Sequence, residues 1–193
     1  LHVVLSDISE GMLRDTRRAI HANVKTSRFD FQVFDCERIP YPDNSFDLVI
    51  ANHILFYCKN LTSVFEEISR VLKTGGTFVC STYGAAHMKE INELVSEFDD
   101  RIVLSADRLF ERFGKENGAD LLAPYFQNIK WLSYEDSLHV TEPETLISYV
   151  LSCHGNQNQY IIDHYKEFRS FVKKKTEKGL HITKDAGIFI CNY

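Results

Sequence analysis

The stretch DNSFDLVIANHILFYCKNLTSVFEEISRVLKTGGTFVCSTY, residues 43–83, decides the fold. Its segment 46–51 is an apolar run that only Asp47 interrupts, which is typical of a strand buried on both faces in a parallel sheet. Apolar residues then recur at helical spacing, namely Leu61, Val64, Phe65, Ile68, Val71 and Leu72. This spacing predicts a helix with one face against a core.

Local signals set the ends of this helix and of the strand that follows. Asn60 or Thr62 can cap its start, and Gly75 can adopt the left-handed conformation after its last turn. Residues 76–81 then predict a second buried strand, which completes a strand–helix–strand unit. Ligands of open α/β sheets bind at the carboxyl ends of such strands. The polar residues gathered there are Asn52, His53, Thr82 and Tyr83.

Length and composition limit the classes of protein to consider. The chain has 193 residues, of which 44% are hydrophobic, and this suits one globular domain. A net charge of -5 argues against a nucleic-acid partner. No apolar run is long enough to predict a membrane span. The five cysteines are odd in number and lack CxxC spacing, which indicates reduced thiols and a cytoplasmic location.

A second strand–helix pair opens the chain. Residues 2–6 predict a short strand that ends at Asp7, and Ser9 can cap the helix that follows. An acidic residue at a strand end can accept two hydrogen bonds from the hydroxyls of a ribose. The same residue can equally serve only as a turn or cap. The residues alone leave both readings open.

These segments together resemble a known family. The chain resembles the small-molecule branch of the class I S-adenosylmethionine-dependent methyltransferases. The resemblance rests on SFDLVIANHILFY, followed by a helix and RVLKTGG, and on LSDISEGML and FDCERIPYPDNSFD earlier in the chain. The resemblance implies an α/β, Rossmann-like, doubly wound and mostly parallel sheet with a late antiparallel strand and an inserted helical lid. It implies a single domain over 1–193, in which about 84–126 and 137–180 form the substrate side or lid.

The resemblance also implies roles for five residues on the cofactor side. Asp7 would bind the ribose of S-adenosylmethionine, and Ile8 would lie against the adenine, with Met12 nearby. Asp35 would accept a hydrogen bond from the adenine amino group, while the backbone N–H of Cys36 faces a ring nitrogen. The alternative for Asp35 is that it caps a turn.

Further candidates follow the two central strands. Asn52 and His53 are expected to border the cofactor, and His53 is the candidate general base because its pKa can lie near neutrality. The alternative for His53 is simple packing. Tyr57 and Tyr83 are expected to border the methyl acceptor. We expect no metal, because the eight histidines show no HxxxH or HExxH spacing.

One motif of the family is missing from the sequence. Its first strand ends in a glycine-rich GxGxG turn that allows close approach of the cofactor, and the nine glycines of this chain form no such cluster. In the family order 3-2-1-4-5-7-6, the missing strand would separate the strands around Val4 and Val49. We therefore expect 1–193 to be part of a longer protein, or to exchange strands in a homodimer.

The remainder of the chain predicts the lid and two late strands. Strands are expected at 128–134 and 188–191, and they fit the antiparallel strands of the family. A helix begins with Pro143 at a first-turn position, and a longer helix spans about 161–172. Residues 184–187 are expected to form a turn before the last strand.

The sequence thus predicts a cytoplasmic enzyme that transfers a methyl group from S-adenosylmethionine to a small molecule by in-line displacement. Two alternatives stay open. The first is a non-catalytic binding or assembly domain of the same fold, which would explain the absent glycine turn. The second is an NAD(P)-binding Rossmann enzyme that uses Asp7.

Overall fold

The computed structural model describes residues 1–23, 28–105 and 108–193. A small parallel sheet begins the chain, with β1 (Val3–Asp7) beside β2 (Phe29–Val33) and α1 (Glu10–Asn23) between them. Val3 faces Phe29 in this register. β2, with the sequence FDFQV, alternates apolar and polar residues as a strand with one covered face does.

The central unit is β3 (Phe46–Asn52), the 3-10 turn η1 (Leu55–Tyr57), α2 (Leu61–Val71) and β4 (Leu72–Tyr83). The side chain of Asn60 caps α2 by accepting from the Ser63 N–H at 3.2 Å. Gly75 has the predicted left-handed conformation, with φ of +78°. It does not terminate α2, however, because the helix ends four residues earlier and Gly75 lies within β4.

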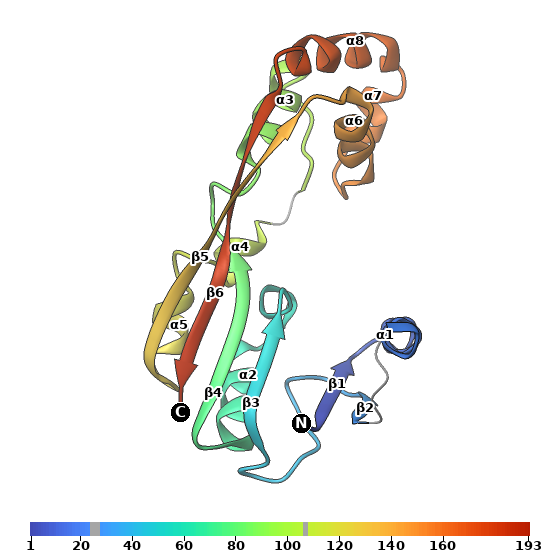
Figure 1. Cartoon of the computed structure of the whole chain (residues 1–193). Coiled ribbons are helices and arrows are strands. Elements are labelled where there is room, and N and C mark those ends of the chain that lie inside the picture. The colour runs from blue at the N-terminus through green and yellow to red at the C-terminus, as the bar shows by residue number, and fades with distance from the viewer. Residues whose placement is uncertain (24–27, 106–107) are drawn as a thin grey trace.

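Helices and two long antiparallel strands complete the fold. They are α3 (Lys89–Phe98), α4 (Leu109–Arg112), α5 (Gly118–Leu122), β5 (Gln127–Val140), α6 (Pro143–Ser152), α7 (Gln157–Ile161), α8 (Tyr165–Thr176) and β6 (Leu180–Asn192). β6 pairs antiparallel with both β4 and β5. Figure 1 shows β5 and β6 projecting beyond β4, with α3, α6, α7 and α8 gathered at their far end.

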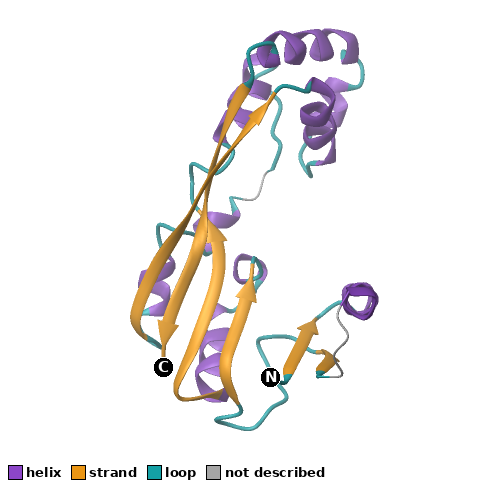
Figure 2. Ribbon diagram, in the orientation of Figure 1, coloured by secondary structure: helices purple, strands orange, loops and turns teal. Residues whose placement is uncertain are grey.

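Within the described residues the strands form two sheets, β1–β2 and β3–β4–β6–β5. β1, which holds Val4, and β3, which holds Val49, are therefore in different sheets, and their predicted separation is confirmed. One further strand between β1 and β3 would give the strand order of the family. Figure 2 shows the two sheets as separate groups of arrows. The α/β class, with parallel inner pairs and antiparallel late strands, is confirmed as well.

The predicted burial of β3 on both faces is wrong for part of the strand. Leu48 and Ile50 are 49% and 56% exposed. The reason is that α2 packs on one face of β3, whereas the face with Leu48 and Ile50 is left open. A cavity of about 130 Å³ lies beside β3, lined also by β1 and α2. The apolar run does form a strand, as predicted. No element among the described residues, however, covers the second face of that strand.

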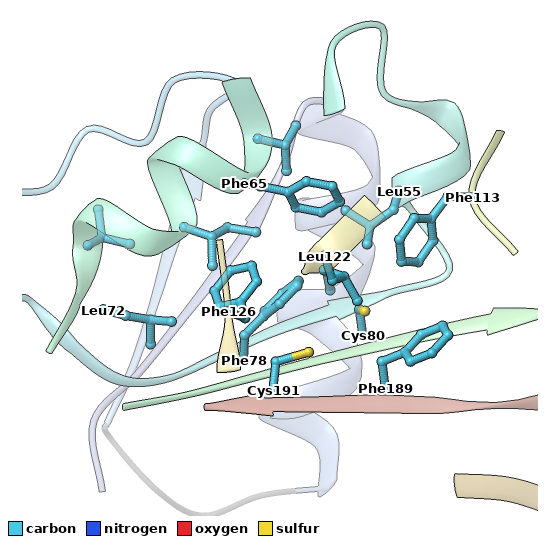
Figure 3. Close-up of a cluster of buried hydrophobic side chains, with 14 of the residues drawn as sticks. Leu55, Phe65, Leu72, Phe78, Cys80, Phe113, Leu122, Phe126, Phe189 and Cys191 are labelled. Atoms are coloured by element: carbon cyan, nitrogen blue, oxygen red, sulfur yellow. The ribbon is translucent and has the colours of Figure 1, made fainter. Parts of the chain in front are cut away.

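Two separate groups of buried side chains hold the molecule together. The sheet core, shown in part in Figure 3, comprises Ile39, Ala51, Leu55, Phe56, Val64, Phe65, Ile68, Val71, Leu72, Phe78, Cys80, Phe113, Leu122, Phe126, Phe189 and Cys191. The helical core comprises Ile91, Leu94, Val95, Ile102, Leu104, Leu146, Ile147, Val150, Ile161, Phe168, Val172 and Ile182. The lid therefore has its own packed interior.

Two details of the expected late elements are wrong. The helix expected over about 161–172 is divided into α7, which ends at Ile161, and α8, which begins at Tyr165 after His164. The expected turn at 184–187 is continuous strand, because these residues pair in register with β5. Gly187 suits that position, since an added Cβ would lie 2.3 Å from the Leu132 carbonyl oxygen and 2.6 Å from the Trp131 ring.

Candidate functional site

A cavity of about 510 Å³ opens where β1, β2 and β3 end, and we call it the strand-end cavity. Segments that are distant in sequence line it: Ser6, Asp7, Ile8, Phe34, Asp35, Cys36, Glu37, His53, Ile54, Tyr57, Cys58 and Lys59. Six of the predicted site residues meet there, namely Asp7, Ile8, Asp35, Cys36, His53 and Tyr57.

Asp7 and Ile8 stand at the end of β1. The Asp7 Oδ1 accepts from the Ser9 N–H at 2.7 Å, and the Ser9 Oγ accepts from the Met12 N–H at 3.3 Å, so both residues start α1. A carboxylate has two oxygens, and this turn leaves acceptor capacity for a ligand. Ile8 is 71% exposed, which gives the cavity an apolar surface.

Asp35 and Glu37 form the loop after β2. The Oδ1 of the exposed Asp35 accepts from the Glu37 N–H at 2.9 Å, and its carbonyl oxygen accepts from the Arg38 N–H. Asp35 therefore caps a turn, as the alternative for this residue predicted. Glu37 Oε1 accepts from the N–H groups of Lys59 and Asn60, both at 2.9 Å. Glu37 thus joins this loop to the positive N-terminal end of α2, a role that the sequence reasoning missed.

Three predicted residues lie outside the lining of this cavity. Met12 projects from α1 with 58% of its side chain exposed. Asn52 is exposed at the end of β3, where its Oδ1 accepts from the Ser81 Oγ at 3.5 Å. Tyr83 lines a different cavity, described below.

His53 begins the loop after β3 in an unusual backbone conformation. Its φ is +51°, which a non-glycine residue adopts rarely. The His53 N–H donates to the Ser81 Oγ at 3.0 Å, and this contact with β4 holds the bend. The imidazole is exposed, and it meets the buried Phe56 ring edge-on at 6.2 Å between centroids. The bend therefore directs the His53 ring toward the strand-end cavity that it lines.

A second cavity of about 640 Å³, the lid cavity, lies between the end of β4, α3 and α6. Its lining includes Tyr83, His87, Met88, Phe110 and Tyr149. Burial raises the pKa of Tyr83, so its hydroxyl stays protonated at neutral pH. The aromatic side chains in this lining offer flat surfaces to an acceptor, beside charged ones such as Glu93 and Arg108.

A row of aromatic rings connects the two cavities. From His53 to Phe56 the centroid distance is 6.2 Å, from Phe56 to Tyr83 it is 5.4 Å, and from Tyr83 to His87 it is 5.2 Å. Tyr57 also packs on Phe56, at 4.7 Å. The two predicted acceptor-side tyrosines thus flank the same phenylalanine, which brings the two cavities next to each other.

His87 lines the lid cavity and is a candidate site residue that the sequence reasoning missed. Burial lowers its pKa, and its Nδ1 is buried with no hydrogen-bond partner among the described residues. A neutral imidazole with an unpaired nitrogen can accept a proton or a hydrogen bond from a ligand. The His87 N–H donates to the Gly84 carbonyl oxygen at 3.1 Å in the turn after β4, a contact that no local sequence pattern reports.

Neither a metal cluster nor a membrane-spanning helix occurs in the described part of the chain. Across residues 1–23, 28–105 and 108–193, no group of three or more His, Cys, Asp or Glu side chains is placed to hold a metal ion. Over the same ranges, no helix has the length and apolar character needed to cross a membrane.

Comparison with known proteins agrees with the fold. Residues 1–80 match the family described as "Methyltransferase domain". The malonyl-[acyl-carrier protein] O-methyltransferase of Nitrosospira multiformis is 32% identical over 107 residues, covering 49% of this chain and 35% of the relative. The ubiquinone/menaquinone biosynthesis C-methyltransferase UbiE of Hydrogenovibrio crunogenus is 40% identical over 74 residues, covering 38% and 29%.

Solved structures extend the likeness to the whole chain. The YcgJ protein of Bacillus subtilis superposes with a TM-score of 0.59 at 14% identity, covering 99% of this chain and 82% of that one. A phosphoethanolamine N-methyltransferase of Haemonchus contortus, solved with S-adenosylhomocysteine, superposes with a TM-score of 0.52 at 19% identity, covering 100% of this chain and 43% of that one. The fold is therefore that of the methyltransferases, in agreement with the resemblance seen in the sequence. The chain spans about a third of the length of the Nitrosospira and Hydrogenovibrio relatives.

Proposed function

We propose that the protein transfers the methyl group of S-adenosylmethionine to a small-molecule acceptor. The observation that carries this proposal is the convergence of Asp7 and Asp35, from different strands, on one cavity with the exposed Ile8. Two carboxylates and an apolar side chain match the ribose hydroxyls, amino group and ring of adenosine. The family match over residues 1–80 supports the same assignment.

The described residues fit the nucleoside half of the cofactor. Asp7 would accept from the ribose hydroxyls and Asp35 from the adenine amino group, while the Cys36 N–H would donate to a ring nitrogen. When bound, the cofactor supplies a methyl group activated by a positively charged sulfur. The chain's own residues then orient the acceptor and exclude water, and no metal or covalent nucleophile is needed.

The lid cavity is the candidate acceptor site, since it adjoins the strand-end cavity through Phe56 and Tyr83. His53 at one end of the aromatic row and His87 at the other are the candidate proton acceptors. Tyr57 and Tyr83 would hold the acceptor between them. The two relatives are named for different acceptors or pathways, and a shared fold does not fix the acceptor, so its class here stays a small molecule.

The cellular setting that we propose is the reducing cytoplasm. All five cysteines are free thiols, although Cys36 and Cys58 have their sulfurs only 3.5 Å apart. Adjacent thiols of this kind persist where thioredoxin and glutathione keep them reduced.

Calorimetric titration with S-adenosylhomocysteine and with NADH tests the proposal. We expect S-adenosylhomocysteine to bind, and Asp7→Asn and Asp35→Asn each to weaken it about 10- to 100-fold, since each removes a charge-assisted hydrogen bond. Asp47→Asn is the matched control, because Asp47 is 85% exposed and pairs only with Lys73 among the described residues. Binding of NADH alone would favour the Rossmann oxidoreductase, and binding of neither ligand the non-catalytic domain.

A further inference from the structure

Two cysteines meet at the wall of the strand-end cavity. Cys36 follows Asp35 in the loop after β2, and Cys58 follows η1, so 22 residues separate them in sequence. Their Sγ atoms are 3.5 Å apart, both side chains are half-buried, and both line the cavity. A disulfide has an S–S length of about 2.05 Å, so the sulfurs need to approach by roughly 1.5 Å.

The surroundings make the two thiols unequal. The hydrogen bond with Cys36 lowers the pKa of Cys58 and outweighs burial, which raises it together with Glu37 and Asp35. Arg112 adds a smaller lowering effect. The same hydrogen bond, together with burial and Asp35, raises the pKa of Cys36. Cys58 is thus the more acidic thiol of the pair and the one that ionises first.

We propose that Cys36 and Cys58 form a reversible dithiol–disulfide site that hydroperoxides oxidise. The Cys58 thiolate attacks the peroxide O–O bond, giving a sulfenic acid after the leaving alkoxide or hydroxide takes up a proton. The Cys36 sulfur then displaces water from Cys58, which forms the S–S bond. The two sulfurs together lose two electrons, which reduce the peroxide. The first step releases an alcohol or, from hydrogen peroxide, water, and the second step releases one water molecule.

This site has a consequence for the strand-end cavity that rests on the proposed function. The Cys36 N–H is the group assigned to an adenine ring nitrogen, and closing the disulfide displaces that loop toward η1. We therefore expect S-adenosylhomocysteine to protect the pair from oxidation, and the oxidised protein to bind it more weakly.

Tryptic mass mapping after treatment with hydrogen peroxide tests the disulfide directly. Cleavage after Arg28, Arg38 and Lys59 places Cys36 in peptide 29–38 and Cys58 in peptide 39–59. The expected result is a linked 29–38/39–59 pair that dithiothreitol separates. Absence of that pair, or a link between the buried Cys80 and Cys191 instead, would overturn the proposal.

Single variants test the order of the two steps. In Cys36→Ser, dimedone should trap a sulfenic acid on Cys58, whereas in Cys58→Ser the labelling of Cys36 should be roughly tenfold slower at neutral pH. Cys153→Ser is the matched control, since Cys153 is also half-buried but lies against the Tyr149 carbonyl oxygen, and it should still form the link. Equal labelling of both cysteines would contradict the assigned order.

The cofactor arm separates the two proposals. If the disulfide forms and S-adenosylhomocysteine gives no protection at a saturating concentration, the thiol site stands and the adenine assignment of Cys36 is wrong. If S-adenosylhomocysteine binds to the reduced protein and no disulfide forms, the cofactor site stands and the thiol site is wrong.

Discussion

Arg70 of α2 makes five hydrogen bonds, three of which hold the loop between β2 and β3 in place. Its Nη1 donates to the Tyr41 carbonyl at 2.7 Å and to Asp43 at 2.9 Å, and its Nη2 donates to the Ile39 carbonyl at 2.9 Å. Nε and Nη2 also donate to Glu67, whose pKa this guanidinium lowers. We expect Arg70→Ala to lower the free energy of unfolding by about 2–3 kcal/mol, measured by urea denaturation.

Lys73→Ala is the control for Arg70→Ala. Lys73 pairs with Asp47 through an exposed contact at 2.9 Å, so its removal should cost at most about 0.5 kcal/mol. Arg70→Lys should recover only part of the loss, because an ammonium group does not reproduce the planar fork. Equal stability of the Arg70→Ala and Lys73→Ala proteins would contradict the anchoring role.

His87 should titrate below its ordinary pKa of 6.5, since burial, with smaller effects of His53 and Lys184, outweighs the nearby Asp185. In the unfolded chain the histidine takes up its proton near pH 6.5, whereas the folded protein resists it. The unfolded state therefore gains protons first, and stability falls as the pH drops below 6.5 until the folded pKa is passed. NMR titration of the imidazole signals measures the shift directly.

His87→Phe tests the same linkage through stability. Phenylalanine keeps a ring against Tyr83 but has no proton to take up, so the stability difference between the natural and variant proteins should change with pH below 6.5. A difference that is constant between pH 5 and 8, or a His87 pKa above 6.5, would contradict the buried neutral imidazole.

The sequence located some site residues and missed others for a physical reason. Asp7, Asp35 and His53 stand at strand ends, where the order of elements alone places them on one edge. His87 and Glu37 act through contacts with elements distant in sequence, and no local spacing reports such contacts. The lining of a cavity depends on how loops pack, which is a property of the whole fold.

At the scale of single elements, periodicity predicted the helices with apolar faces and misread one strand. α2 buries Val64, Phe65, Ile68 and Val71, as its helical spacing indicates. The segment 184–187 contains Lys, Asp and Gly, which favour turns, yet it pairs with β5 throughout. Pairing with a long neighbouring strand outweighs local turn preference, and the length of that neighbour was not visible in the sequence.

Gly187→Ala tests this explanation of β6. The added Cβ would meet the Leu132 carbonyl oxygen and the Trp131 ring, so the strands must separate locally. We expect a loss of about 1–3 kcal/mol in thermal or urea unfolding. Gly11→Ala in α1 is the control, because its Cβ would make only an ordinary contact of 3.5 Å with Ser9. That change should be neutral or stabilise by up to about 1 kcal/mol.

At the scale of the whole molecule, the order of strands was predictable and the position of the lid was not. The separation of β1 from β3 follows from the family order with one strand missing. The helical core, by contrast, forms at the far end of β5 and β6, away from the sheet core (Figure 1). The length of these two strands sets that distance. The sequence predicted strands only at 128–134 and 188–191, whereas β5 has 14 residues and β6 has 13.

The open side of β3 should make the 193-residue chain self-associate. Leu48 and Ile50 expose large apolar surfaces beside a strand edge that has no partner among the described residues, which is the arrangement that favours strand pairing between molecules. We expect Ile50→Lys to weaken association about tenfold or more in sedimentation velocity, because it removes about 1.5–3 kcal/mol of apolar burial from the contact.

Ile162→Lys is the control for this surface, since Ile162 is 65% exposed but lies between α7 and α8 in the lid. Both variants should unfold within about 0.5 kcal/mol of the natural chain, because both sites are exposed. A dimer that Ile162→Lys disrupts as strongly as Ile50→Lys would place the contact on the lid. A chain that stays monomeric at high concentration would show that this apolar edge is covered within a single molecule.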